Sequence, residues 1–330
     1  MFDRSKHIAF DVETAGELPE YALQPWRASN DLSWITSYAI AWFDDQGKVK
    51  TKAVQSPTRG EIFDFLEHTA HAGKTICAWN APFDAGWPVA LNLEASLIRC
   101  KWLDGLRLRR HWEVEPEYDT AAAKKKPYDL KTTVAQEYPQ FAGYDEGIDF
   151  QDMSPAMVAK RLKYNQLDAA FTLKLTEKYY NLLLESDPKR LRAALIEAMC
   201  IPMVAGANVR GLTIDRRAAE ELDLTLSVRA EGLLAELSQY GATPEVLASS
   251  KQLARLLFEE WGLPVQNRSA KTGAPSTDKE ALYELGYYDP RAALIKQYRE
   301  SVNNRTKFVQ GTLTTLDYNG DGRVRPQARI

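Results

Sequence analysis

The sequence has little that would place it in an oxidising compartment or a lipid bilayer. Its three cysteines, Cys77, Cys100 and Cys200, are an odd number without a CxxC pair, so we expect reduced thiols and no disulfide framework. The longest apolar run without charge, residues 198–209, is too short to span a bilayer and contains Pro202. The charged N-terminus lacks the apolar stretch of a signal peptide. We therefore predict a cytoplasmic protein with no membrane partner.

The chain also lacks a strong net charge. Its formal charge of −3 gives no global basic field, so nucleic-acid binding would have to come from local patches. It does contain apolar material: 45% of its 330 residues are hydrophobic. This amount excludes a disordered or low-complexity chain, and the length suggests about two domains.

The first half alternates strand and helix patterns. Strands are predicted at residues 6–12, 37–43, 48–54 and 74–79, and an amphipathic helix at residues 61–71. Such alternation is typical of an α/β fold, here with a mixed sheet.

The middle of the chain contains a loop followed by a long helix. Residues 113–126 show no periodicity and carry a lysine triplet; a solvated loop is the commoner outcome, and a nucleic-acid contact is the alternative. Ser154 and Pro155 form a good helix start, and the helical pattern then continues to about Leu184. The character changes near Asp187, after which the sequence is mostly helical.

Two pairs of polar residues follow predicted strands. Asp11 and Glu13 are two residues apart in an extended segment, so their side chains share one face. Two acids so placed are tolerable around a cation, although exposed strand-end acids are the simpler interpretation. Asn80 and Asp84 come directly after the strand that ends near Trp79, at an edge where α/β sites gather. Helix capping is the alternative there.

A third pair lies on the long helix. Tyr164 and Asp168 are four residues apart and share a helical face; alone, they could form an ordinary surface hydrogen bond. Together with the acids at Asp11, Glu13 and Asp84, they match a site for two hard cations, Mg²⁺ or Mn²⁺, which prefer carboxylate oxygens. Tyr164 would orient or help deprotonate an attacking water.

These three motifs resemble those of the DEDDy 3′–5′ exonucleases. The position of the histidine in the related histidine variant is Lys163 here, so the tyrosine variant is the match. The resemblance implies an RNase H-like domain over residues 1–187, with Asp11, Glu13, Asp84, Tyr164 and Asp168 as catalytic residues and the four acids as ligands of two divalent ions. It gives Asp104 a supporting role.

The second half resembles the beginning of the polymerase domain of family A DNA polymerases. Three segments carry the resemblance: residues 197–215, residues 250–264 and residues 271–278, the last being the most specific. Residues 298–308 resemble the long thumb helix. The resemblance implies that residues 188–330 form a palm base and a mainly α-helical thumb.

The family also suggests DNA contacts. It implies a single-stranded 3′ end in the exonuclease site and duplex DNA at the thumb. The residues that it assigns to these contacts are Thr14, Asn80, Phe83, Lys271, Thr272, Ser276, Thr277, Asn304, Arg305 and Lys307. For Lys271, Arg305 and Lys307, solvated surface charge is the alternative, and for Phe83 and Trp87 it is core packing.

The sequence departs from the family pattern in several places. Ser250 replaces a usual proline, the segment at Asn304 fits only loosely, and Tyr128 begins a segment that is often His-Ser-Leu. The sequence ends at Ile330, before the palm and fingers of a family A enzyme, so we expect no DNA polymerisation by this chain alone.

Three functions follow from the resemblance. The preferred hypothesis is a proofreading 3′–5′ exodeoxyribonuclease that releases nucleoside monophosphates. The second is a DNA-holding subunit of a split polymerase, bound to a separate palm–fingers chain. An exposed edge strand at the split would pair with that chain. The third is a stand-alone ribonuclease D-like RNA exonuclease. A processivity factor as a further partner, and a bacteriophage source with the host cytoplasm as location, rest on family analogy alone.

Residues 317–322 (DYNGDG) resemble the first half of a calcium-binding EF-hand loop. The twelfth position, which should be glutamate, is Ala328. A hairpin turn rich in Asn and Gly is therefore the preferred interpretation.

Overall fold

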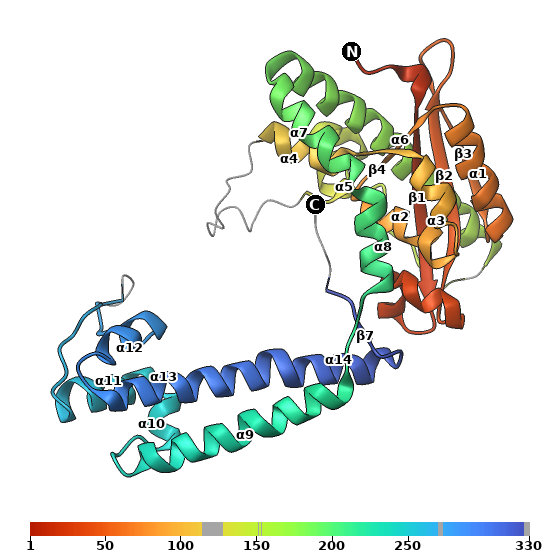
Figure 1. Cartoon of the computed structure of the whole chain (residues 1–330). Coiled ribbons are helices and arrows are strands. Elements are labelled where there is room, and N and C mark those ends of the chain that lie inside the picture. Colours follow the sequence, from red (N-terminus) through yellow and green to blue (C-terminus); the bar gives the residue numbers. More distant parts are fainter. Residues whose placement is uncertain (114–127, 151, 153, 270–272, 327–330) are drawn as a thin grey trace. The chain divides into compact units, whose positions relative to one another are not determined.

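The structure is a computed structural model that describes residues 1–113, 128–150, 152, 154–269 and 273–326. Its contacts divide the chain into two compact units. The first comprises Met1–Gly211 with the segment from Arg325 onward, and the second is Leu212–Val324. The helical residues 188–210, predicted to begin the second domain, belong by contacts to the first unit. The two units are described separately below (Figure 1).

The first unit contains a five-stranded sheet in the order β3-β2-β1-β4-β5. The strands are β1 (His7–Gly16), β2 (Ser33–Phe43), β3 (Val49–Gln55), β4 (Thr75–Ala78) and β5 (Lys101–Asp104). β1 pairs antiparallel with β2 and parallel with β4, which pairs parallel with β5. The predicted mixed sheet is therefore confirmed, and β5 is an additional strand that the sequence analysis did not identify.

Helices cover both faces of this sheet. Phe10 of β1 stacks on Phe65 of α1 (Arg59–His71), with ring centroids 4.9 Å apart. The neighbouring Asp11 instead accepts a hydrogen bond from Asn165 of α6 (Pro155–Ser186). Because successive strand residues point to opposite faces, α1 and α6 lie on opposite sides of the sheet.

Both helices predicted from sequence are present: α1 begins two residues before the predicted start at residue 61, and α6 begins at the predicted Ser154 cap. Thr58 and Glu61 form a reciprocal capping box at the start of α1. The Ser154 hydroxyl accepts from the amide of Met157 at the start of α6, and Pro155 occupies the first turn. These local hydrogen bonds satisfy amides that have no partner within the helix.

Shorter helices complete the first unit. They are η1 (Arg4–Lys6), η2 (Pro19–Leu23), η3 (Pro25–Asn30), α2 (Ala81–Ala90), α3 (Glu94–Arg99), α4 (Gly105–Glu113), α5 (Leu130–Glu137), η5 (Pro139–Phe141), α7 (Pro188–Met199) and α8 (Ile201–Arg210). The predicted loop at residues 113–126 begins at the end of α4, and its remaining residues lie outside the described part of the chain.

Helices α7 and α8 together form a long, largely apolar helical stretch within the described residues. Together they run over Pro188–Arg210, 23 residues that by length and composition could cross a membrane. The sequence analysis considered only the shorter run within this stretch. Leu191, Ala198 and Ile201 of these helices are buried in the core of the first unit, and core helices of globular units pass the same test. The prediction of no membrane partner stays a prediction.

The second unit is mainly helical. Its elements are β6 (Leu212–Thr213), α9 (Arg216–Ser238), α10 (Pro244–Ala248), α11 (Ser250–Arg255), the π-helix η6 (Leu256–Glu260), α12 (Lys279–Leu285), α13 (Pro290–Asn303), the π-helix η7 (Asn304–Gln310), α14 (Gly311–Asn319) and β7 (Arg323–Val324). The short strands β6 and β7 pair antiparallel. α9 packs along α13 and η7 (Figure 1).

The segment at residues 317–322 is the end of a helix. α14 continues through Asn319, and Gly320 terminates it in the left-handed conformation that favours glycine. Asp317 forms an ion pair with Arg216, and Asp321 accepts from the amide of Arg323. The predicted local hairpin is wrong, because β7 pairs with the distant β6.

Candidate active site

The structure brings three of the four predicted acids together, two from the middle of β1 and one from α6. Carboxylate oxygens of Asp11, Glu13 and Asp168 all lie within 4.8 Å of one another. Asp11 and Glu13 are half-buried on the same face of β1, and Asp168 of α6 is buried beneath them. A bulge between Glu13 and Thr14 shifts the register of β1 against β2 directly after the two acids, which re-aims the strand at this point.

Burial, together with nearby carboxylates, raises the affinity of Asp11 and Glu13 for protons. Burial, and then the neighbouring carboxylates of Asp168 and Asp84, raise the pKa of Asp11 well above its usual range. Burial and Asp168 raise the pKa of Glu13 to about 8. Such shifts mark a place where negative charge is costly unless a cation compensates it.

Asn165 orients Asp11. Its amide nitrogen donates to Asp11 Oδ2 at 2.6 Å, and its amide oxygen accepts from the hydroxyl of Ser37 on β2 at 3.2 Å. Asn165 is fully buried, so this chain from Ser37 to Asp11 fixes the carboxylate relative to the sheet. A second layer of this kind is what holds metal-binding carboxylates in place.

Asp168 is held from the other side by two residues outside α6. Lys131 of α5 places its Nζ 2.6 Å from Asp168 Oδ2, and the Tyr144 hydroxyl donates to Asp168 Oδ1. Lys131 also lies 4.9 Å from the ring centroid of Tyr164. Burial is the largest single influence and lowers the pKa of Lys131, but Asp168 and Tyr164 together raise this pKa above its ordinary value.

Tyr164 lies beside the acids as predicted. Its ring stacks on that of Tyr144 at 6.0 Å. Burial, with Asp168 and Glu13 nearby, raises the pKa of the Tyr164 phenol far above its ordinary value. The phenol thus lies beside the acids, where a hydroxyl can take part in positioning a water.

Asp84 is buried at the first turn of α2. Its Oδ1 accepts from the amide of Val12 at 3.2 Å, just beyond the last β1–β4 pair, Ala9 with Cys77. Burial raises the pKa of Asp84 well above its ordinary value. It contributes to the raised pKa of Asp11, although the group of acids within 4.8 Å of one another does not include it.

Asp104 accepts three hydrogen bonds from backbone amides next to the site. Its carboxylate accepts from the amides of Asn80 at 3.0 Å, Ala81 at 3.1 Å and Leu106 at 3.0 Å. Asn80 has a left-handed backbone with φ of 66° and makes no side-chain cap to α2. Asp104 thus holds the turn between β4 and α2, and α2 carries Asp84.

A cavity of about 590 Å³ opens beside these acids within the first unit. Asp11, Asn80, Phe83 and Lys131 line it, together with arginines of α4. Phe83 is half-buried at its edge, whereas Trp87 is fully buried in the core. The core interpretation is confirmed for Trp87, and Phe83 presents part of its ring to the cavity.

The residues predicted to contact DNA differ in whether their side chains are exposed, buried or already hydrogen-bonded within the chain. In the first unit, the Thr14 hydroxyl donates to the carbonyl of Ala22. In the second, Ser276 donates to Asp278 and Thr277 is buried.

Arg305 makes a two-pronged ion pair with Asp223, from Nε at 3.0 Å and from Nη2 at 3.1 Å. Asn304 and Lys307 are exposed on η7. Lys271 and Thr272 lie outside the described residues.

The sequence analysis missed Lys131, Tyr144 and Asn165. Asn165 directly follows Tyr164, so the sequence places it beside the motif. The sequence did not predict which way the Asn165 side chain points. Lys131 follows the Tyr128 segment that departs from the family pattern. Nothing in the sequence placed Tyr144, because only the packing of residues 128–144 on α6 brings it to Asp168.

The donor set fits a hard divalent ion. Three carboxylates converge within 4.8 Å, and the raised pKa values of Asp11 and Glu13 indicate that negative charge is costly there without a cation. Oxygen-only ligands of this type select Mg²⁺ or Mn²⁺ over softer metals. Asp11, Glu13 and Asp168 would hold such an ion, with Asp84 adjacent.

The chain is similar to known DNA polymerases. The sequence model described as DNA polymerase family A matches residues 216–329. A thermostable DNA polymerase I of Thermus filiformis is 35% identical over 107 residues, 32% of this chain and 13% of that protein. One of Thermus thermophilus is 30% identical over 183 residues, 54% of this chain and 22% of that protein. The matches to these two relatives thus span less than a quarter of their length.

A solved structure shares the fold. The POL domain of Pol1 from M. smegmatis, in complex with DNA primer-template and dNTP, superposes with a TM-score of 0.66 at 16% identity. The match covers 96% of this chain and 48% of that one. By its fold and by the sequence of its helical unit, this chain is related to the family A DNA polymerases.

Proposed function

We propose that the chain is a metal-dependent 3′–5′ exonuclease of the DEDDy type on an RNase H-like domain, acting on DNA as the proofreading part of a family A DNA polymerase. The convergence of Asp11, Glu13 and Asp168 beside the cavity carries this proposal. The relationship of residues 216–329 to family A polymerases favours DNA as the substrate.

Two divalent ions bound to the acids would supply an activated water and stabilise the leaving 3′ oxygen. The chain's own residues would do the rest. Asn165 holds Asp11 in place, and the Tyr164 hydroxyl, beside the acids, is available to orient a water. The half-buried Phe83 offers a face on which a terminal base could stack.

The test uses 5′-labelled single-stranded DNA and a matched RNA, incubated with the full chain in Mg²⁺ or Mn²⁺. We expect a descending ladder on DNA that a chelator abolishes. Asp11→Ala should slow cleavage at least about a hundredfold, because it removes a metal ligand. Asp45→Ala, at an exposed turn after β2, is the matched control and should cleave normally.

Other outcomes would point to the alternatives. Faster digestion of RNA than of DNA would favour the ribonuclease D-like function. Unchanged cleavage by Asp11→Ala would refute the site. An inert chain that still binds duplex DNA would favour the DNA-holding subunit of a split polymerase, which the match to residues 216–329 supports independently.

A further inference from the structure

The positively charged side chain of Lys131 lies next to the acids. Its Nζ lies 2.6 Å from Asp168 Oδ2. The side chain of Asp168 is only 2% exposed, while that of Lys131 is 35% exposed and lines the cavity. The ammonium thus reaches the buried carboxylate from the open side of the site.

The local structure holds this lysine in place. Asp129 caps α5 by accepting from the amide of Thr132 at 2.8 Å, so Lys131 sits in the first turn of a short, anchored helix. The face of the Tyr164 ring contacts its ammonium at 4.9 Å, which adds a cation–π attraction. Lys131 therefore approaches Asp168 from a separate element rather than as a neighbour on α6.

Both carboxylate oxygens of Asp168 already have a partner in the structure. Asp168 Oδ2 accepts from Lys131, and Asp168 Oδ1 accepts from Tyr144. A divalent ion bound among Asp11, Glu13 and Asp168 would lie within a few ångströms of the ammonium, and two positive charges so close repel each other in a partly buried site.

We propose that Lys131 is a built-in competitor for the metal site: its ammonium neutralises Asp168 in the metal-free protein and has to withdraw from that carboxylate when a divalent ion binds. The released ammonium stays at the wall of the cavity, where it faces the incoming substrate. Metal affinity is thereby held below what the carboxylates alone would give. This inference rests on the metal site of the proposed function, but not on exonuclease activity.

The experiment measures Mn²⁺ binding to the full chain without DNA. Free Mn²⁺ is followed by its electron paramagnetic resonance signal at pH 8.5. We expect Lys131→Met, which keeps the length of the side chain and removes its charge, to bind Mn²⁺ on the order of tenfold more tightly than the parent chain. Lys131→Arg retains the charge and should stay within about threefold of the parent.

Lys163→Met is the matched control. Lys163 lies on α6 immediately before Tyr164 and is exposed, so its loss removes the same charge without touching Asp168. Its Mn²⁺ affinity should match that of the parent. Asp11→Ala should bind far less Mn²⁺ and so shows that the signal reports this site.

Equal or weaker Mn²⁺ binding by Lys131→Met than by the parent would overturn the proposal, even if the parent cleaves DNA. Binding by Lys131→Met where the parent binds too weakly to measure would support it. No binding by either chain would overturn both this inference and the metal site. Cleavage without any effect of Lys131 on Mn²⁺ affinity would leave the proposed function intact.

Discussion

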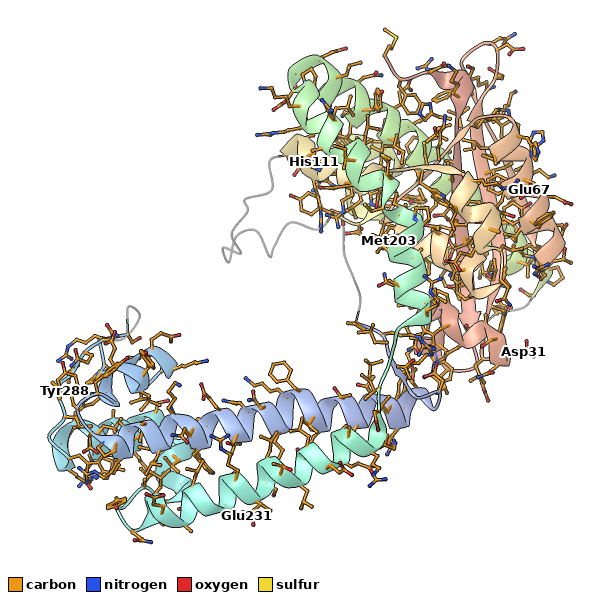
Figure 2. The ribbon with its side chains drawn as sticks, in the orientation of Figure 1. Asp31, Glu67, His111, Met203, Glu231 and Tyr288 are labelled. Atoms are coloured by element: carbon orange, nitrogen blue, oxygen red, sulfur yellow. The ribbon has the colours of Figure 1, made fainter. Side chains whose placement is uncertain are left out.

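The two units of the chain place their charged residues in opposite ways. In the first unit, acids such as Asp84, Asp104 and Asp168 are buried inside a broad core around the sheet. In the second, the ion pairs of Arg216 with Asp317 and Arg305 with Asp223 lie near the surface. Figure 2 shows side chains crowded around the sheet and spread more thinly along α9 and α13.

This difference goes with the sizes of the two hydrophobic cores. Buried acids lower stability unless hydrogen bonds or a cation compensate them, so a unit that contains them needs a large core. The second unit has a small core, which includes Leu237, Leu257 and Ile295 near one end of the helix pair. The helices beyond this core depend more on surface contacts.

The largest effect should come from breaking the smaller core. Leu257 is fully buried, and Leu257→Ala should destabilise the second unit by about 2–5 kcal/mol, because it leaves a cavity. Hydrogen exchange of the full chain should then accelerate in α9 and α13 while the sheet stays protected.

Leu222→Ala is the control for this experiment, because Leu222 is 48% exposed on α9. It should change stability by less than about 0.5 kcal/mol. Faster exchange in β1 and β4 after Leu257→Ala would show that the two units do not differ in the way described.

The second effect should appear as a pH dependence of the first unit without metal. Glu13 has a folded-state pKa of about 8 against an ordinary value of 4.5, and the pKa of Asp11 is raised as well. The folded state holds protons that the unfolded chain releases. The stabilisation is complete below the ordinary value and is lost as pH rises through about 8.

The measurement is thermal unfolding in a chelator between pH 6 and pH 9, with hydrogen exchange assigning the transition to the sheet. We expect the midpoint to fall as pH rises, and Asp11→Asn to flatten the slope because an amide does not titrate. Mn²⁺ should reverse the fall. A midpoint that rises with pH would contradict the buried, protonated cluster.

The smallest effect should come from the ion pair between Arg305 of η7 and Asp223 of α9. The side chains of Arg305 and Asp223 are 33% and 22% exposed, so Arg305→Ala and Asp223→Ala should each cost less than about 1 kcal/mol. The double substitution should cost about as much as either one, as a double-mutant cycle would measure.

Duplex DNA binding adds a second readout at this pair. If Arg305 contacts phosphate as predicted, Arg305→Ala weakens binding and lowers its salt dependence, while Asp223→Ala does not weaken it. Equal weakening by both substitutions would mean that the pair acts on DNA only through the helix geometry.

Local sequence signals predicted much of this fold. Ser154 and Pro155 marked the start of α6, because capping depends on residues within one helical turn. The first helix was predicted from residue 61, and α1 begins two residues earlier, at Arg59. β5 was missed, because two of its four residues, Lys101 and Asp104, are charged, whereas the equally short β4 is an apolar run. The hairpin at residues 317–322 was wrong because its Gly residues end a helix as readily as they form a turn.

For the site, the sequence by itself determined which acids share a face. The period of a strand places Asp11 with Glu13, and that of a helix places Tyr164 with Asp168. Tertiary structure alone decided that Lys131 and Tyr144 meet Asp168 and that Arg305 pairs with Asp223. Contacts between distant segments depend on how whole elements pack against each other, which local residue patterns do not encode.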